Sequence, residues 1–90
     1  MNHYVYLIIS LHKKKLITYV GYTNNIQKRL KLHNTSKGAK FTRGRNWKII
    51  YKRKYNTKKE AMKNEYYLKK NKLKRNNLKK IYKLKNNIKL

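Results

Sequence analysis

Residues 19–33 read YVGYTNNIQKRLKLH and pass from a strand-like pattern, through a single glycine, into a helix-like pattern. Tyr19 and Val20 are residue types favoured in strands, and Gly21 has no side chain to fill the space beside it. Asn24 can cap a helix that begins at residue 25 and ends near residue 34. The stretch therefore predicts a strand followed directly by a helix.

Two polar side chains of this expected helix, Arg29 and His33, lie beside its buried edge. At about 100° per residue, Ile26, Leu30 and His33 share one stripe, and Arg29 flanks that stripe one turn before His33. Either polar residue alone is typical of structure: an arginine lying along the rim of a core, or a packed imidazole. Both together, next to a tyrosine-rich face of a sheet, indicate a shared site.

Three apolar runs predict that sheet. YVYLIISL (4–11) and LITYVGY (16–22) predict a hairpin with a four-residue loop at 12–15, and WKIIYKRKY (47–55) predicts a third strand. Side chains alternate across a strand, so one face is expected to be aliphatic and the other largely tyrosine. The expected aliphatic face holds Val5, Leu7, Ile9, Leu16 and Val20, and the other holds Tyr4, Tyr6, Tyr19 and Gly21.

The C-terminal half predicts two helices. Thr57 and Glu60 have the spacing of a capping box, which opens a helix expected from Lys58 to about residue 72. A third, fraying helix is expected within 73–90, where apolar residues recur at near-helical spacing among lysines.

We therefore expect an α/β (α+β) fold: a small three-stranded antiparallel sheet flanked by helices, with a basic C-terminal helix. The residues from 35 to 46 form its one long loop. We expect one domain, in which residues 1–77 form the main body and residues 78–90 a basic helical extension.

The charge of the chain points to a polyanionic partner. Its 90 residues include 27 Lys and Arg but two acids, giving a net charge of +25, and nucleic acid is the commonest partner for such a chain. A/T-rich codons account for part of the lysine content but not for having only two acids. Cysteine is absent, which excludes disulfides and thiolate metal sites. The apolar run at 5–11 is too short for a membrane span, so we expect a cytoplasmic protein without a membrane partner.

Motifs along the chain resemble those of the GIY-YIG nuclease superfamily in order and spacing. They are Tyr4-Val5-Tyr6, Tyr19-Val20-Gly21, Arg29, His33-Asn34 and a helix-borne Glu65. The closest resemblance is to the small stand-alone single-domain bacterial members, whose loop resembles GAKFTRGR (38–45) and whose second helix resembles EAMKNEYYLKK (60–70). Tyr4-Val5 stands where Gly-Ile gives the family its name, while the last tyrosine of that motif is retained.

The resemblance implies hydrolysis of DNA phosphodiester bonds with one divalent metal, Mg²⁺ or Mn²⁺. It implies that Tyr6 orients or deprotonates the nucleophile and that Tyr19 supports it by hydrogen bonding. His33 occupies a position where such proteins place a histidine or tyrosine. The acid–base chemistry of tyrosine adds a condition. The pKa of its hydroxyl is about 10, so Tyr6 can act as a base only with a metal or cation nearby.

The resemblance also implies where phosphate binds. Gly21 matches the glycine that lets backbone and phosphate approach, and Arg29 the arginine that steadies phosphate charge. The chain has only five Arg beside 22 Lys, so Arg43 and Arg45 are further positions where a bidentate guanidinium is informative. With Lys40, these loop residues are the expected nucleic-acid contacts.

Glu65 is expected to hold the metal, as the resemblance implies. On a helical wheel it falls within the apolar side expected for the second helix, formed by Ala61, Met62, Tyr66, Leu68 and Leu73. A carboxylate there must meet a cation, and an ion pair with Arg29, Lys69 or Lys72 is the alternative to a metal. One carboxylate suffices for Mg²⁺, because that ion keeps several waters and shares a substrate phosphate.

Two functions remain from the sequence. The favoured one is a metal-dependent DNA endonuclease of low sequence specificity, acting on duplex or branched DNA in repair or recombination. The alternative is a non-catalytic nucleic-acid-binding protein, for example a ribosome-associated one, which needs the charge but not the motifs. A domain this small has little room for base-specific contacts, so a protein partner that supplies substrate choice is also expected.

Overall fold

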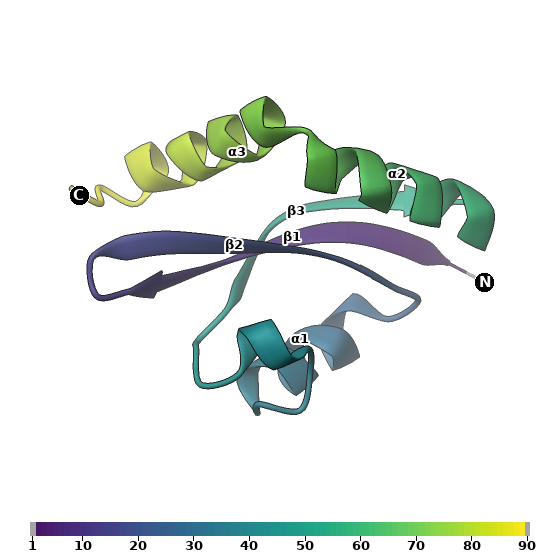
Figure 1. The fold of residues 1–90 in the computed structure, drawn as a ribbon, viewed down its shortest axis with the longest axis horizontal. Helices are drawn as coiled ribbons and strands as arrows, with labels where there is room; N and C mark the ends of the chain where they lie inside the picture. Colours follow the sequence, from purple (N-terminus) through teal and green to yellow (C-terminus); the bar gives the residue numbers. More distant parts are fainter. Residues whose placement is uncertain (1, 90) are drawn as a thin grey trace.

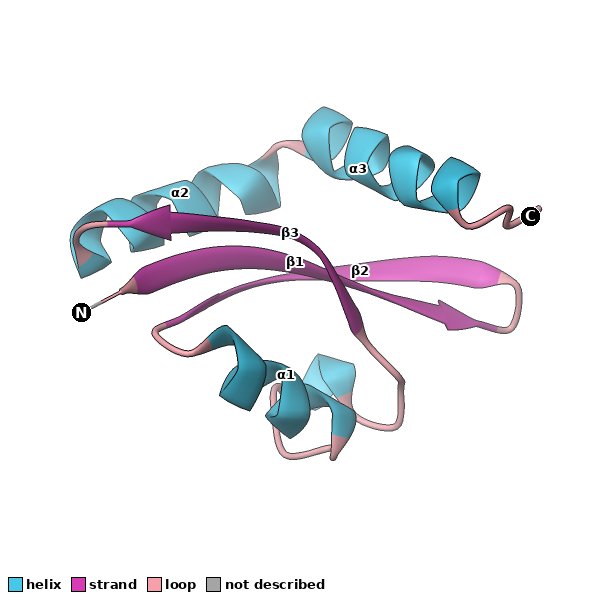
Figure 2. Cartoon of the chain, turned by 180° about the vertical axis from the view of Figure 1, so that it is seen from behind, coloured by secondary structure: helices cyan, strands magenta, loops and turns pink. Residues whose placement is uncertain are grey.

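The computed structural model describes residues 2–89, which form a three-stranded sheet between two helical layers (Figure 1). The strands β1 (His3–His12), β2 (Lys15–Thr23) and β3 (Lys48–Tyr55) are antiparallel and lie in the order β2-β1-β3. The helix α1 (Ile26–Asn34) lies on one face, and α2 (Lys58–Lys70) and α3 (Lys72–Lys85) cover the other (Figure 2). The expected fold class is confirmed.

The β1–β2 hairpin is tighter than the sequence suggested. Its loop has two residues, Lys13 and Lys14, with φ of 49° and 65°, so the prediction of a four-residue loop is wrong. These positive φ values are those of a type I′ turn, which matches the twist of the strands it joins. Two-residue and four-residue loops give the same facing pairs, so Tyr6 lies opposite Gly21 and Leu7 opposite Val20 as expected.

The ends of the helices follow capping chemistry. α1 is capped by Asn25, whose Oδ1 accepts from the Lys28 N–H at 3.1 Å, so the prediction of Asn24 as the cap is wrong by one residue. Thr57 caps α2 as predicted, and its Oγ1 accepts from the Glu60 N–H at 3.1 Å. Asn71 ends α2 and caps α3, so α2 is shorter than expected.

The long loop between α1 and β3 is partly ordered into a short 3₁₀ helix, η1 (Lys40–Thr42), that the sequence analysis did not predict. The division at residue 78 stays a prediction, and α3 runs through that residue without a break.

The two faces of the sheet have different cores. Beneath α2 and α3 the buried residues are aliphatic: Val5, Leu7, Val20, Ala61 and Leu68. Beneath α1 they are Tyr6, Ile8 and Trp47.

The predicted apolar side of α2 is correct only for Ala61 and Leu68. Met62 and Tyr66 are 50% and 57% exposed, and Leu73, which begins α3 instead, is 77% exposed. The two buried positions, Ala61 and Leu68, lie seven residues apart, so one narrow strip of about two turns seats α2 on the sheet. Within residues 2–89, no helix combines the length and apolar character needed to cross a membrane.

Candidate active site

A hydrogen bond between Tyr6 on β1 and His33 on α1 joins the two elements at the centre of the lower layer. The Tyr6 hydroxyl lies 2.7 Å from His33 Nε2, and the two residues are 2% and 0% exposed. The packed imidazole that sequence analysis considered is therefore present, but it is packed against the tyrosine of the first motif.

The hydrogen bonds of Thr42 determine how this pair shares its proton. Its hydroxyl donates to the Ala39 carbonyl at 2.7 Å, so Oγ1 is left to accept from His33 Nδ1–H at 2.8 Å. His33 therefore carries its proton on Nδ1, and Nε2 accepts the hydrogen of the Tyr6 hydroxyl. Thr42 is 0% exposed, and η1 brings it to the imidazole.

The loop that carries Thr42 is fixed to α1 by further directional bonds. Asn34 pairs with the Trp47 backbone, accepting from its N–H at 2.6 Å and donating to its carbonyl at 3.2 Å. The Trp47 indole donates to the Thr42 carbonyl at 2.9 Å. Gly38 packs against the imidazole, since a Cβ there would lie 2.5 Å from His33 Nδ1.

Gly21 makes room for Tyr6. A Cβ on this residue would lie 2.2 Å from both the Cζ and the hydroxyl oxygen of the tyrosine. The glycine is thus required by the neighbouring strand, and the tyrosine ring fills the space that a side chain would take.

Arg29 lies beside the Tyr6–His33 pair and affects both groups. Burial raises the pKa of Tyr6, and it does so against a hydrogen bond and a positive charge from Arg29 that lower this pKa. Burial and the same guanidinium lower the pKa of His33. Tyr6 is therefore a neutral donor and His33 a neutral acceptor at neutral pH. The Nε of Arg29 is buried without a hydrogen-bond partner among residues 2–89.

Tyr19 contacts the pair from β2. Its ring meets the His33 imidazole edge-on at 5.3 Å between centroids and stacks on Phe41 at 6.1 Å with an interplanar angle of 19°. Phe41 is 53% exposed, so an aromatic wall leads from the buried imidazole to the surface.

Glu65 approaches the same centre from α2. Its charge acts on Tyr6, where it raises the pKa, and its side chain is 21% exposed. Lys69, one turn later, makes an ion pair with it at 3.8 Å and is itself 53% exposed. Of the three cations considered from sequence, Lys69 is thus the one paired with Glu65. An exposed pair of this length contributes little to stability.

The carboxylate of Glu65 fits a divalent cation. It is a hard oxygen donor, and residues 2–89 contain no group of three or more His, Cys, Asp or Glu that could form a closed metal cage. A hard cation that keeps most of its waters needs only such a single carboxylate together with a phosphate.

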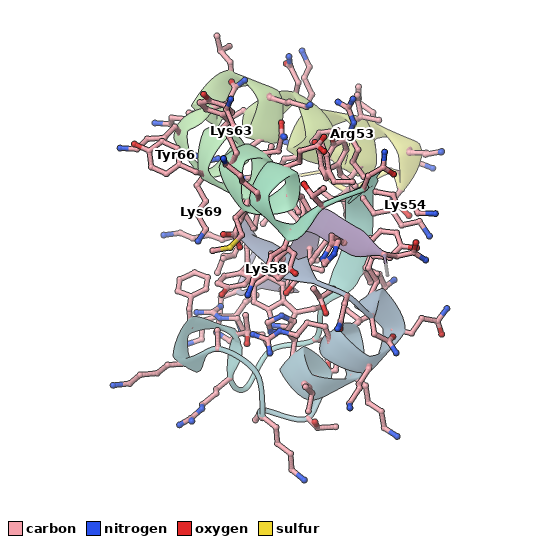
Figure 3. The ribbon with its side chains drawn as sticks, turned by 90° about the vertical axis from the view of Figure 1, so that its right-hand side faces the viewer. Arg53, Lys54, Lys58, Lys63, Tyr66 and Lys69 are labelled. Carbon is pink, nitrogen blue, oxygen red and sulfur yellow. The ribbon has the colours of Figure 1, made fainter. Side chains whose placement is uncertain are left out.

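A groove opens along β2. A hollow of about 300 Å³ is lined by Thr18, Tyr19, Val20, Phe41, Lys69 and Arg75. Figure 3 views the molecule from the side, with α2 above the sheet and α1 with its loop below, and with Lys69 and Tyr66 extending from the same side of α2. Arg75 holds the corner between α2 and α3, because its Nε donates to the Leu68 carbonyl at 3.1 Å.

The loop cations divide into two kinds. Arg45 lies over the Phe41 ring at 5.8 Å, and one of its terminal nitrogens, Nη1, is buried without a partner among the described residues. Lys40 and Arg43 are exposed and belong to none of the contacts around Tyr6. The structure thus brings together Tyr6, Tyr19, Gly21, Arg29, His33 and Glu65. The side chains of Lys40 and Arg43 lie outside this group.

Three residues of the site were not identified from sequence: Gly38, Phe41 and Thr42. All three lie in GAKFTRGR, of which sequence analysis used only the cations. A phenylalanine and a threonine in an otherwise basic loop were the available signal, since neither side chain carries charge.

The family of the chain follows from comparison with known proteins. A family model described as the GIY-YIG catalytic domain matches residues 2–80. The chain belongs to the GIY-YIG family. This match confirms the resemblance inferred from the two tyrosine motifs.

Curated GIY-YIG relatives of similar size are bacterial UPF0213 proteins, whose names state no activity. One from Bacillus licheniformis is 53% identical over 70 residues, which cover 77% of this chain and 69% of that protein. One from Oceanobacillus iheyensis is 46% identical over 69 residues, covering 76% and 77%. The solution NMR structure of a UPF0213 protein from Bacillus halodurans is 38% identical, covers 90% of this chain and 85% of that one, and has a TM-score of 0.48.

Proposed function

We propose that this protein is a metal-dependent DNA endonuclease that hydrolyses phosphodiester bonds. The observation that carries the proposal is the convergence of Tyr6, His33, Arg29 and Glu65, which come from three elements and act on one buried hydroxyl. A protein that only bound nucleic acid would need the charge of the chain but not this buried proton-transfer pair.

Tyr6 and His33 form a path for the proton of the attacking water. A water that approaches the Tyr6 oxygen gives its proton to that oxygen, while the Tyr6 hydrogen passes to His33 Nε2. The resulting hydroxide attacks phosphorus, the bond to the leaving oxygen breaks, and that oxygen takes a proton from solvent. Protonated His33 then returns its extra proton to solvent, which restores the neutral imidazole. The neutral state of His33, which its lowered pKa maintains, leaves Nε2 free to receive the proton.

Arg29 is the proposed phosphate ligand. Its buried Nε lacks a partner among residues 2–89, and a guanidinium offers two parallel donors to a pair of phosphate oxygens. A positive charge held next to the Tyr6 hydroxyl also favours negative charge as it develops in the transition state.

A divalent ion, Mg²⁺ or Mn²⁺, would be held by Glu65. When bound, it would neutralise charge on the scissile phosphate and make a water more acidic. Gly21 clears space for Tyr6, and Tyr19 fixes the imidazole from its other side.

The substrate is DNA whose sequence is read weakly. The excess of Lys and Arg contacts phosphates, which carry no sequence information directly. Lys40, Arg43 and Arg45 supply such contacts in the loop at 35–46, where duplex and branched DNA would be distinguished. A partner protein that brings the enzyme to its substrate would provide further selectivity in repair or recombination.

The Glu65→Gln variant tests the proposal, and Glu60→Gln is its matched control because these are the only two acids and both lie in α2. We expect Glu65→Gln to fold and to bind DNA as well as or better than the wild type, but to lose about 10²–10³-fold of Mg²⁺-dependent or Mn²⁺-dependent nicking of labelled DNA. Glu60→Gln should cleave normally. Near wild-type cleavage by Glu65→Gln would overturn the metal assignment and the mechanism built on it.

A further inference from the structure

A second hollow lies at the hairpin end of the same edge of the sheet. It has a volume of about 610 Å³ and is lined by Lys15, Leu16, Ile17, Asn76, Lys79, Lys80 and Lys83. Its walls come from β2 and α3, and none of its residues belongs to the candidate active site.

The two hollows follow one another along β2. Residues 15–17 line the one at the hairpin end, and residues 18–20 line the one beside Tyr19 and Phe41. β2 is an edge strand, because the order of the sheet is β2-β1-β3, so no further strand among residues 2–89 covers this line. Six strand residues span about 17 Å, which is roughly the axial length of five phosphate-to-phosphate steps on one DNA strand.

The chemistry of the second hollow fits a nucleic-acid backbone. Four of its lining residues are lysines from two separate elements, and both acids of the chain are on α2. Leu16 and Ile17 give it an apolar floor, against which sugars and the stems of the lysines can pack while the ammonium groups meet phosphates. Further lysines, Lys13 and Lys14, form the turn beside it.

We infer that the substrate strand leaves the active site along the edge of β2 and that its backbone is held at a second phosphate-binding site by Lys15, Lys79, Lys80 and Lys83. This inference rests on the proposed function for the position of the scissile phosphate. It assigns α3 a role in gripping the strand several nucleotides away from the bond that is cut.

A charge-matched pair of variants tests the inference. Lys15→Gln/Lys79→Gln/Lys80→Gln removes three charges from the second hollow. Lys54→Gln/Lys59→Gln/Lys72→Gln removes three exposed lysines that line neither hollow. Lys54 extends from the side of the molecule opposite to Lys69 (Figure 3). Circular dichroism and thermal unfolding check that both variants fold.

Binding is measured by fluorescence anisotropy in EDTA, so that no cleavage is needed, with a 20-nucleotide single strand, a 20-base-pair duplex and a tetranucleotide. On at least one of the long ligands, the Lys15→Gln/Lys79→Gln/Lys80→Gln variant should bind about tenfold more weakly than the control. Its plot of log K against log salt should flatten by about two to three, from three lost contacts at 0.9 each on duplex or 0.7 on single strands. The tetranucleotide is too short to span both hollows, so the difference between the two variants should be smaller with it than with the long ligands.

Equal losses for the two variants on both long ligands would overturn the second site, because charge would then act only as a general field. This outcome is distinguishable from failure of the proposed function. A protein that binds as expected but never cleaves retains the second site and loses the nuclease mechanism. A protein that cleaves while the two variants bind alike retains the mechanism and loses the second site.

Discussion

The two layers on either side of the sheet are stabilised in different ways. Beneath the sheet, α1 and its loop are joined by a chain of short directional hydrogen bonds that runs through Tyr6, His33, Thr42, Trp47 and Asn34. Above it, α3 has no buried residue, and Ile81 and Leu84 are 59% and 69% exposed. One layer fixes the position of a few atoms, and the other displays lysines.

This difference separates chemistry from affinity. Hydrogen bonds in a buried network tolerate little displacement, so the lower layer can hold a proton-transfer pair in register. Electrostatic attraction to a polyanion falls off slowly with distance and tolerates movement of flexible side chains. Changes in the hydrogen-bonded network of the lower layer should therefore affect turnover at constant binding, and changes to the lysines of α3 should affect binding at constant turnover.

Among changes in the lower layer, the largest expected effect comes from Arg29→Lys, which keeps the charge and removes the guanidinium fork. Turnover should fall about 100-fold, because the transition state loses a bidentate donor, while affinity for DNA stays within about threefold because the overall field is unchanged. Single-turnover cleavage and anisotropy measure the two quantities separately. Near-normal turnover would place Arg29 on the structural rim of the site.

Gly21→Ala should come next. The new Cβ would meet the Tyr6 ring, which cannot move away because its hydroxyl is bonded to His33, and we expect a loss of about 2–3 kcal/mol in the free energy of unfolding with strongly reduced cleavage. Gly44→Ala is the control. Its φ of +74° disfavours alanine, but a Cβ built on Gly44 would have no atom within 4 Å. Gly44→Ala should therefore lose stability and keep its activity. Equal activity of the two variants would contradict the role of Gly21.

Thr42→Val should have a smaller effect. It removes the acceptor of His33 Nδ1–H and leaves a buried donor unpaired, which costs about 1–2 kcal/mol of stability in urea unfolding. Cleavage should fall with it, because the tautomer of His33 is no longer fixed. Thr18→Val, on the half-buried edge of β2, makes the same chemical change away from the imidazole and should be nearly neutral for stability. A neutral Thr42→Val would remove the threonine from the relay.

The smallest effect expected is on the pH dependence of stability. The pKa of His33 is lowered from 6.5 by burial and by Arg29, so below pH 6.5 the unfolded chain binds this proton more readily than the native protein does. The free energy of unfolding should thus fall as the pH drops below 6.5, and this group should contribute no change above it. Thermal unfolding at pH 7.5 and 5.5 measures the fall against a low background, because the chain has only two acidic side chains.

The His3→Gln/His12→Gln variant is the control for that measurement, and it should retain the fall. If the fall disappears in this variant instead, the dependence belongs to His3 or His12 and not to the buried pair.

Much of the fold could be predicted because it depends on local patterns. Alternation along residues 4–11 and 16–22 determined the two faces of the sheet even though the loop length was wrong, since both loop lengths are even. Thr57 and Glu60 located the start of α2 because a capping box is local. The exposure of Met62, Tyr66 and Leu73 could not be predicted, because it depends on how much of α2 the narrow sheet can cover.

The site divides in the same way. Tyr6, Gly21, Arg29, His33 and Glu65 could be chosen from motif order and helix geometry. The partnership of His33 with Thr42 could not, because it depends on how the loop at 35–46 folds back as η1, and that path is set by tertiary bonds from Asn34 and Trp47.

The turn between β1 and β2 combines a high positive charge with a strained backbone. Lys13 and Lys14 both adopt the left-handed backbone region, where asparagine and glycine would sit without strain. An Asn-Gly turn would make the hairpin more stable, so the two substitutions Lys13→Asn and Lys14→Gly should raise the stability of the protein. The same two substitutions would remove two cations from the end of the β2 edge. At this turn, a gain in thermal stability would therefore lower the affinity for a polyanion.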